Sequence, residues 1–291
     1  MSEVPAPPNE IQETQTVPEN DWFSDVLGAC AERLVALGTF ASFCADTFRW
    51  LCWKIPRWEL LSQSFYNIGV LSLPVVMLTG MFIGMVLAVQ CYTQFKAISM
   101  ESALGGVISL SLVRELGPVL AATMLAGRVG SALAAEIGTM RVTEQIDALT
   151  AMGANPLHYL VVPRFLACLF LIPALTVIAD FTGVFGGAFY CTKILDINDH
   201  YYWTNAKEFV GLFDIIAGMG KSVFFGSVIA LISCHQGFHC KDGAEGVGKA
   251  ATQAFVYSFV AILFLDLMLG IILERISSIL GITVTVMKGG M

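Results

Sequence analysis

Long stretches without a charged side chain limit what this chain can fold into. They cover residues 60–95, 116–127, 165–179 and 222–240. A membrane-spanning helix needs about 20 predominantly apolar residues, so several spans fit. Only 13% of the 291 residues are charged, against about 25% in a soluble domain. The chain is therefore predicted to be an all-α, multi-pass integral membrane protein and not a soluble enzyme.

Five apolar segments are long enough to cross a bilayer. We expect these spans at about residues 65–95, 104–135, 159–190, 212–235 and 252–272. Before them, residues 22–64 alternate apolar and charged side chains and place tryptophans beside lysine and arginine, which suits the boundary between headgroups and hydrocarbon. We predict an amphipathic interfacial helix region over residues 22–64 and a five-span domain over residues 65–275.

The two ends of the chain differ from this pattern. Residues 1–21 hold four prolines and five acidic residues with hardly an apolar one, which predicts a disordered tail. They also lack the basic and apolar regions of a signal peptide. We expect residues 276–291 to form a C-terminal extension. The net charge of -7 is spread along the chain without a basic block, so nothing indicates nucleic-acid binding.

Lysine and arginine near the span ends predict the orientation. Nine of them flank the side that carries the segment before the first span, the connection between spans two and three, and the loop between spans four and five. Five flank the opposite side. Because cytoplasmic loops carry the excess of positive charge, the side with nine lysine and arginine residues is expected to face the cytoplasm.

Arg114 and Glu115 lie inside the second apolar segment, where an ionisable group is costly unless it faces a cavity or a partner. Adjacent residues point about 100° apart on a helix, so these two do not pair with each other. Pro118 cannot donate to the carbonyl of Arg114 and disturbs the helix further. A kinked polar site is predicted at residues 114–118, either as an interhelical salt bridge or as the lining of a binding or gating cavity.

The longest polar stretch on the cytoplasmic side covers residues 136–156. We predict a short amphipathic helix there, in which Met140, Glu144 and Asp147 share one face. A glycine and a proline end it. It is either a generic loop helix or a docking site for a soluble partner, and its length and mixed chemistry favour docking.

Small residues recur at every fourth position of three spans, which lets helices approach closely in lipid. The positions are Ala122, Ala126, Gly130, Ala134 and Gly138 in the second span, Gly80, Gly84 and Ala88 in the first, and Gly183 and Gly187 in the third. Packing within the chain is the simpler interpretation. A homodimer seam is the alternative for one stripe.

Two short motifs suggest sites but lack the right context. Gly220-Lys221-Ser222 matches the end of a phosphate-binding loop, but Ile215 stands where the first glycine is required and a span surrounds it. A cluster at the end of the fourth span contains Cys234, His235, His239 and Cys240. Adjacent ligand pairs rarely converge on one ion, so no metal or other cofactor is expected in this chain.

Longer motifs resemble the MlaE (YrbE-type) family of ABC-transporter permeases. They are residues 112–119 (LVRELGPV), 126–132 (AGRVGSA) and 135–149 (AEIGTMRVTEQIDAL), with further matches at 66–72, 80–87, 163–167 and 243–248. The resemblance implies a permease subunit of the inner membrane that is not itself an enzyme. Its family forms a homodimer bound to cytoplasmic ABC ATPase subunits, which use the ATP, and to a ring of MCE-domain proteins. Such complexes move phospholipid or a related lipid between the inner membrane and the outer envelope.

The resemblance also implies roles for particular residues. The coupling helix that meets the ATPase is expected within residues 136–156, with Met140, Arg141, Thr143, Glu144, Gln145, Asp147 and Met152 as its contact residues. The wall of a lipid cavity between the two copies is expected at Leu87, Gln90, Tyr92, Phe95, Ile98, Glu115 and Leu116.

Two other functions stay open from the residues alone. An ion- or proton-coupled secondary transporter would use Arg114 and Glu115 as its relay, and it predicts internal repeats and broken helices. A structural scaffold for a membrane complex would tolerate Glu115→Ala.

Overall fold

The computed structural model describes residues 22–53, 58–241 and 243–279. The described residues are almost entirely helical. Among these described residues, those up to Phe43 belong to one compact unit and those from Cys44 onward belong to a second. The predicted tail at residues 1–21 and most of the C-terminal extension, residues 280–291, lie outside the described residues.

The first helix, α1 (Trp22–Trp53), contributes its residues up to Phe43 to the first unit. Leu34, Val35 and Leu37 on this helix are 64–69% exposed. Within the expected interfacial region, the described residues form α1 and the start of α2 (Trp58–Ile68). The placement of α1 at a membrane interface stays a prediction.

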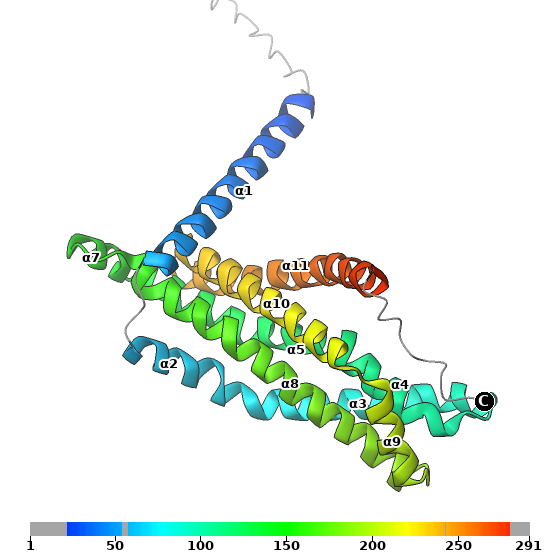
Figure 1. Ribbon diagram of the computed structural model, residues 1–291. Helices are drawn as coiled ribbons and strands as arrows, with labels where there is room; N and C mark the ends of the chain where they lie inside the picture. The colour runs from blue at the N-terminus through cyan, green and yellow to red at the C-terminus, as the bar shows by residue number, and fades with distance from the viewer. Residues whose placement is uncertain (1–21, 54–57, 242, 280–291) are drawn as a thin grey trace, which may run out of the picture. The chain divides into compact units, whose positions relative to one another are not determined.

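Five helical segments among the described residues are long and apolar enough to cross a membrane, which confirms the expected number of spans (Figure 1). Span one joins α2, the turn η1 (Val70–Ser72) and α3 (Leu73–Ala97). Span two joins α4 (Leu104–Ser111), η3 (Leu112–Leu116), α5 (Gly117–Leu125), η4 (Ala126–Gly130) and α6 (Ser131–Val142). Span three joins η5 (Leu157–Val161) and α8 (Val162–Lys193), and spans four and five are α10 (Leu212–Phe238) and α11 (Gly243–Ile279).

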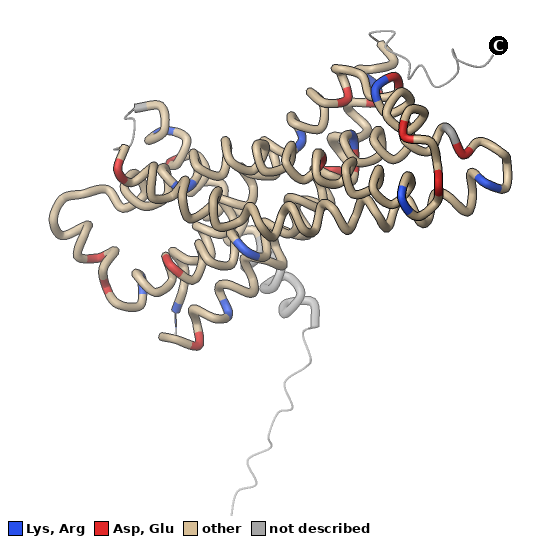
Figure 2. Tube along the Cα trace, turned by 90° about the horizontal axis from the view of Figure 1, so that it is seen from below, with Lys and Arg blue, Asp and Glu red and all other residues tan. Residues whose placement is uncertain are grey.

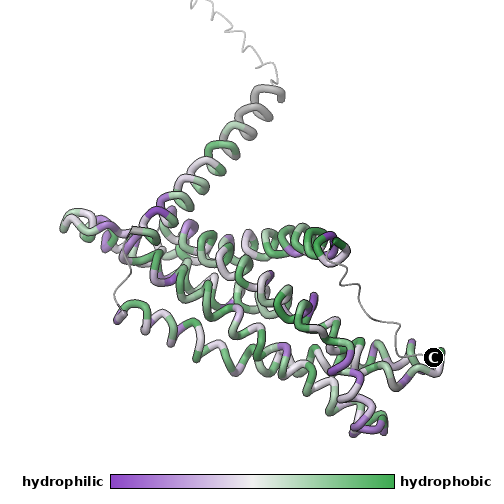
Figure 3. The backbone as a smooth tube through the Cα atoms, in the orientation of Figure 1, coloured by the Kyte–Doolittle hydropathy of each residue, from purple (hydrophilic) through white to green (hydrophobic). Residues whose placement is uncertain are grey.

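Three short helices lie between the spans: η2 (Glu101–Ala103), α7 (Gln145–Ala151) and α9 (Asp199–Phe209). Charged residues lie mostly towards the ends of the helical bundle, and only a few lie along its middle (Figure 2). Apolar residues cover most of the length of the spans (Figure 3). This distribution is the one a bilayer requires, because a charge at its centre is costly.

Glycine allows α3 and α8 to pack backbone against backbone. A Cβ atom at Gly84 would lie only 1.8 Å from the carbonyl oxygen of Gly183, and one at Gly80 would lie 2.6 Å from that of Ala179. The two helices pack along much of their length. In lipid, such close contact supplies van der Waals attraction in place of a hydrophobic driving force.

All ten small residues of the predicted stripes are buried within one chain. Gly130 faces Ser233 and Ile229 of α10, for example, and Gly138 faces Cys240 just beyond it. The stripes therefore serve packing within the chain. The alternative of a homodimer seam on one of them is wrong, because a seam between copies needs residues on the outer surface.

The segments predicted to share one side of the membrane lie at one end of the bundle. The loop after α10 meets the end of α6, and the start of α2 shares a cavity with Met140 and Tyr159. Helix α9 packs on the start of α4 at the opposite end, where Gly105 lies against the backbone of Tyr202. The assignment of the first end to the cytoplasm stays a prediction.

Candidate functional site

A π-helical turn interrupts the second span at the predicted polar site. This turn, η3 (Leu112–Leu116), carries Arg114 and Glu115, and the N–H of Gly117 donates to the carbonyl five residues earlier. Pro118 follows and has no N–H to continue the helical ladder. Such π-bulges are frequent at functional sites. The helix is thus irregular where the sequence predicts it.

Lys221 connects three spans through two ion pairs. Its Nζ atom lies 2.5 Å from Oε2 of Glu115 on the second span and 3.2 Å from Oδ1 of Asp266 on the fifth. The Lys221 side chain, on α10, is only 1% exposed, whereas that of Glu115 is 47% exposed. A buried ammonium group is stable only when it is paired. Glu115 therefore has two environments, a buried cation on one side and the outer surface of the chain on the other.

Arg114 pairs with a different residue of α10, the helix that carries Lys221. Its Nη1 atom lies 3.9 Å from Oδ1 of Asp214, in the first turn of α10. The other carboxylate oxygen of Asp214 accepts the N–H of Gly211 at 3.0 Å. Because Asp214 and Lys221 are seven residues apart, they lie two turns apart on one face of α10. That face receives both charged residues of the π-helical turn.

Another carboxyl group lies close to the same turn. Asp180 of α8 places Oδ1 beside Gly117, where a Cβ atom would be only 1.6 Å away. Oδ1 is buried and has no hydrogen-bond partner among the described residues. Gly117 therefore gives the Asp180 side chain the room to approach the backbone next to η3.

The seven residues of the predicted lipid-cavity wall divide into two groups in the single chain. Leu87, Tyr92, Phe95 and Leu116 are partly buried against a core cluster made of Ala88, Leu104, Ile108, Leu112, Ala188, Cys191 and Tyr202. Gln90 and Ile98 are exposed, and Glu115 faces Lys221. Tyr202, outside the spans, donates its hydroxyl to the Val184 carbonyl at 3.2 Å, and burial raises its pKa. A shared cavity wall between two copies stays a prediction.

The predicted single helix over residues 136–156 is wrong. Helix α6 ends at Val142, and α7 (Gln145–Ala151) is separate. Glu144 between them has a φ of 59°, in the left-handed region. This break turns α7 back on α6, so that Asp147 Oδ1 lies 2.6 Å from Nη1 of Arg141. Met140, Glu144 and Asp147 therefore do not share one continuous helical face.

The predicted ATPase-contact residues are nevertheless accessible. Thr143, Glu144, Gln145, Asp147 and Met152 are exposed, and Met140 and Arg141 are partly buried. Ile146 is buried and anchors α7, while Met152 is 74% exposed. The Asn155 carboxamide oxygen accepts the N–H of Leu157 at 2.9 Å, which starts the third span. Polar and apolar side chains are thus presented together at one end of the bundle.

The two rejected motifs have other roles here. Lys221 of the glycine-lysine-serine motif belongs to the ion pairs described above. His235 and His239 stack with their ring centroids 4.2 Å apart. In residues 22–53, 58–241 and 243–279, no group of three or more His, Cys, Asp or Glu side chains is arranged to hold a metal ion.

Three residues of the ion-pair network were not identified from the sequence: Asp214, Lys221 and Asp266. A signal for them was present, because each is an ionisable residue in an apolar segment and such residues need a partner. The choice of partners depends on how neighbouring helices are rotated, which one sequence does not give.

Comparison with known proteins identifies relatives of the chain. Residues 61–272 match the family model of the permease MlaE. A probable ABC transporter permease protein of Rickettsia felis is 47% identical over 205 residues, which cover 70% of this chain and 79% of the relative. A probable ABC transporter permease protein of Synechocystis is 44% identical over 209 residues, covering 72% of this chain and 79% of the relative.

A third relative has a more specific name. The intermembrane phospholipid transport system permease protein MlaE of Haemophilus influenzae is 37% identical over 214 residues, covering 73% of this chain and 82% of the relative. The matched region of the family model contains the whole ion-pair network, from Arg114 to Asp266.

Proposed function

This chain belongs to the MlaE family of permeases, and from that membership we propose that it is the membrane-spanning subunit of an ABC transporter for phospholipid. Family membership carries the proposal, and the five spans support it. The Haemophilus relative is named for phospholipid transport between membranes. The ion-coupled transporter and the scaffold, which the residues alone left open, do not follow from membership of an ABC permease family.

The proposed complex has three kinds of protein component. Two copies of the chain enclose a lipid cavity, cytoplasmic ATPase subunits hydrolyse ATP, and MCE-domain proteins carry the lipid beyond the inner membrane. Closure of the ATPases moves the segment after Val142, which narrows the cavity and expels the lipid. The exposure of Glu144 and Met152, and the Arg141–Asp147 ion pair that joins α7 to α6, support this role for the segment.

Purification of the tagged full chain from its native membrane tests the proposal. We expect mass spectrometry to find an ABC ATPase and an MCE-domain protein at comparable abundance, together with bound phospholipid. The same preparation should hydrolyse ATP. Recovery of the chain alone in several mild detergents, with activity that depends on a proton gradient, would contradict the proposal and favour the ion-coupled alternative.

Charge reversal on α7 tests the coupling role. We expect Glu144→Lys together with Asp147→Lys to lower ATPase activity and ATPase copurification, because both side chains are exposed where the partner is proposed to dock. The fold should tolerate the change, since the exposed Arg141–Asp147 pair contributes only about 0–1 kcal/mol. Lys193→Glu, at the opposite end of the bundle, is the matched control. Unchanged copurification and ATPase activity in the double variant would contradict the coupling role.

A further inference from the structure

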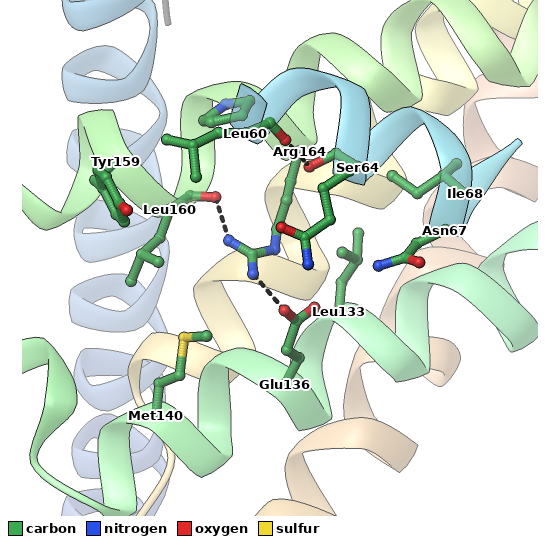
Figure 4. A pocket seen from close by; sticks show the side chains of 12 residues that line it. Leu60, Ser64, Asn67, Ile68, Leu133, Glu136, Met140, Tyr159, Leu160 and Arg164 are labelled. Carbon is green, nitrogen blue, oxygen red and sulfur yellow. Dashed lines mark hydrogen bonds and ion pairs between the residues drawn. The ribbon is translucent and has the colours of Figure 1, made fainter. Parts of the chain in front are cut away.

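A cavity of about 240 Å³ lies between three helices at the end of the bundle that contains α7 (Figure 4). Its lining comes from α2, from α6 and from the start of the third span. The wall is mixed: Leu60, Ile68 and Leu133 are apolar, whereas Gln63 and Asn67 carry amide groups. The predicted wall of the lipid cavity between two copies contains none of these residues, so this is a separate site.

One ion pair lines this cavity. Nη2 of Arg164 lies 2.6 Å from Oε1 of Glu136, and Nη1 of Arg164 donates to the Leu160 carbonyl at 2.7 Å. Figure 4 shows the guanidinium between these two acceptors. The Arg164 side chain is 11% exposed and the Glu136 side chain is 48% exposed. The cavity therefore presents a buried cation beside a more accessible carboxylate.

The length of the helices places this ion pair at the depth of the lipid headgroups. The third span, from Leu157 to Lys193, has 37 residues, or about 55 Å of helix. The hydrocarbon core is only about 30 Å thick, so each end of a centred span extends about 12 Å beyond it. Arg164 is seven residues from the start, about 10 Å along the helix. The charge-free stretch 165–179 begins directly after it.

We propose that this cavity binds the headgroup of a zwitterionic aminophospholipid from the adjacent leaflet. The ammonium group of such a lipid faces the Glu136 carboxylate, and its phosphate faces Arg164 and the amides of Gln63 and Asn67. The volume suits a headgroup rather than a whole lipid, since pockets that enclose drug-sized ligands measure about 300–1,000 Å³. The acyl chains remain in the bilayer.

The accessible carboxylate decides which headgroup fits. An anionic headgroup without an amine would still place its phosphate near Arg164, but it would bring no cation to Glu136 and would leave that carboxylate beside the negative charge of the phosphate. Two negative charges held close together repel each other, and they do so more strongly at the edge of the hydrocarbon than in water. The site does not depend on the proposed transport, because a lipid that only stabilises the fold would bind in the same way.

Site-specific photocrosslinking in the full chain tests the proposal. The variant Tyr159→p-benzoylphenylalanine places the probe in the cavity wall and removes no group proposed to bind the headgroup. The variant Ser62→p-benzoylphenylalanine places it on an exposed position of α2 that does not line the cavity. Both variants are reconstituted in nanodiscs of equal parts phosphatidylethanolamine and phosphatidylglycerol. Mass spectrometry of the adducts identifies the lipid bound at each position.

We expect the probe at residue 159 to favour phosphatidylethanolamine about tenfold, the effect of one hydrogen bond to a charged group, and the probe at residue 62 to give near-equal adducts. Added to the residue 159 probe, Glu136→Gln should remove most of the preference. Asn67→Trp should fill the cavity and lower the yield, whereas Ser62→Trp should not.

Three results would overturn the site: equal adducts at residues 159 and 62, a preference for phosphatidylglycerol at residue 159, or a preference that survives Glu136→Gln. None of these depends on ATPase activity or on partner subunits. Failure of the headgroup site is therefore distinguishable from failure of the proposed transporter function.

Discussion

Lys221→Met is expected to destabilise the protein strongly and to abolish its transport activity. The side chain is 1% exposed and pairs with Glu115 and Asp266, so its loss leaves two carboxylates in the membrane without their cation. Removing one partner of a buried ion pair costs about 3–5 kcal/mol. Because Glu115 is partly exposed, we expect a fall in melting temperature of roughly 5–15 °C, measured by scanning fluorimetry in detergent.

A triple variant separates the structural role of this network from a functional one. Glu115→Gln, Lys221→Met and Asp266→Asn together leave no charge, and neutral replacement of a buried ion pair is often tolerated. We expect the triple variant to regain most of the lost stability but not the transport of lipid. If it regains both, the network is only an interhelical salt bridge. If Lys221→Met has the same melting temperature as the parent protein, the network does not hold the three spans together.

The number of spans, and which connecting segments lie at the same end of the bundle, could be predicted because both depend on composition and chain order alone. A long apolar stretch with few charged residues marks each span, and alternate loops share an end because each span crosses the bundle once. The partners of Arg114 and Glu115 could not be predicted in this way. Asp214 and Lys221 are both on α10, and the choice between α10 and another helix depends on interhelical rotation.

The break after α6 shows a different limit of the sequence. Residues 136–156 have apolar positions at helical spacing, so one helix is the natural interpretation. Glu144 nevertheless takes a left-handed conformation, which is uncommon for a residue other than glycine. No glycine or proline at residues 143–144 signals the turn. The Arg141–Asp147 pair and the burial of Ile146 depend on this turn, and neither follows from local sequence preference.

Gly84→Ala is expected to disrupt the packing of the first span on the third. The new methyl group would lie 1.8 Å from the carbonyl oxygen of Gly183 and 2.6 Å from its carbonyl carbon. These are backbone atoms in the middle of a helix, so they cannot rotate away as a side chain can. Relief requires α3 and α8 to separate, and that removes the close contact along both helices. Overpacking of this kind typically costs about 1–3 kcal/mol, and more where no neighbour can yield.

A matched glycine distinguishes this clash from a general effect of alanine. A methyl group added at Gly248 in α11 would meet no atom within 4 Å, and alanine is favoured over glycine in a helix by about 1 kcal/mol. We therefore expect Gly248→Ala to melt at or above the temperature of the parent, and Gly84→Ala to melt several degrees below it and to elute partly as aggregate in size-exclusion chromatography. Equal melting temperatures for the two variants would mean that α3 and α8 do not make this backbone contact in the folded protein.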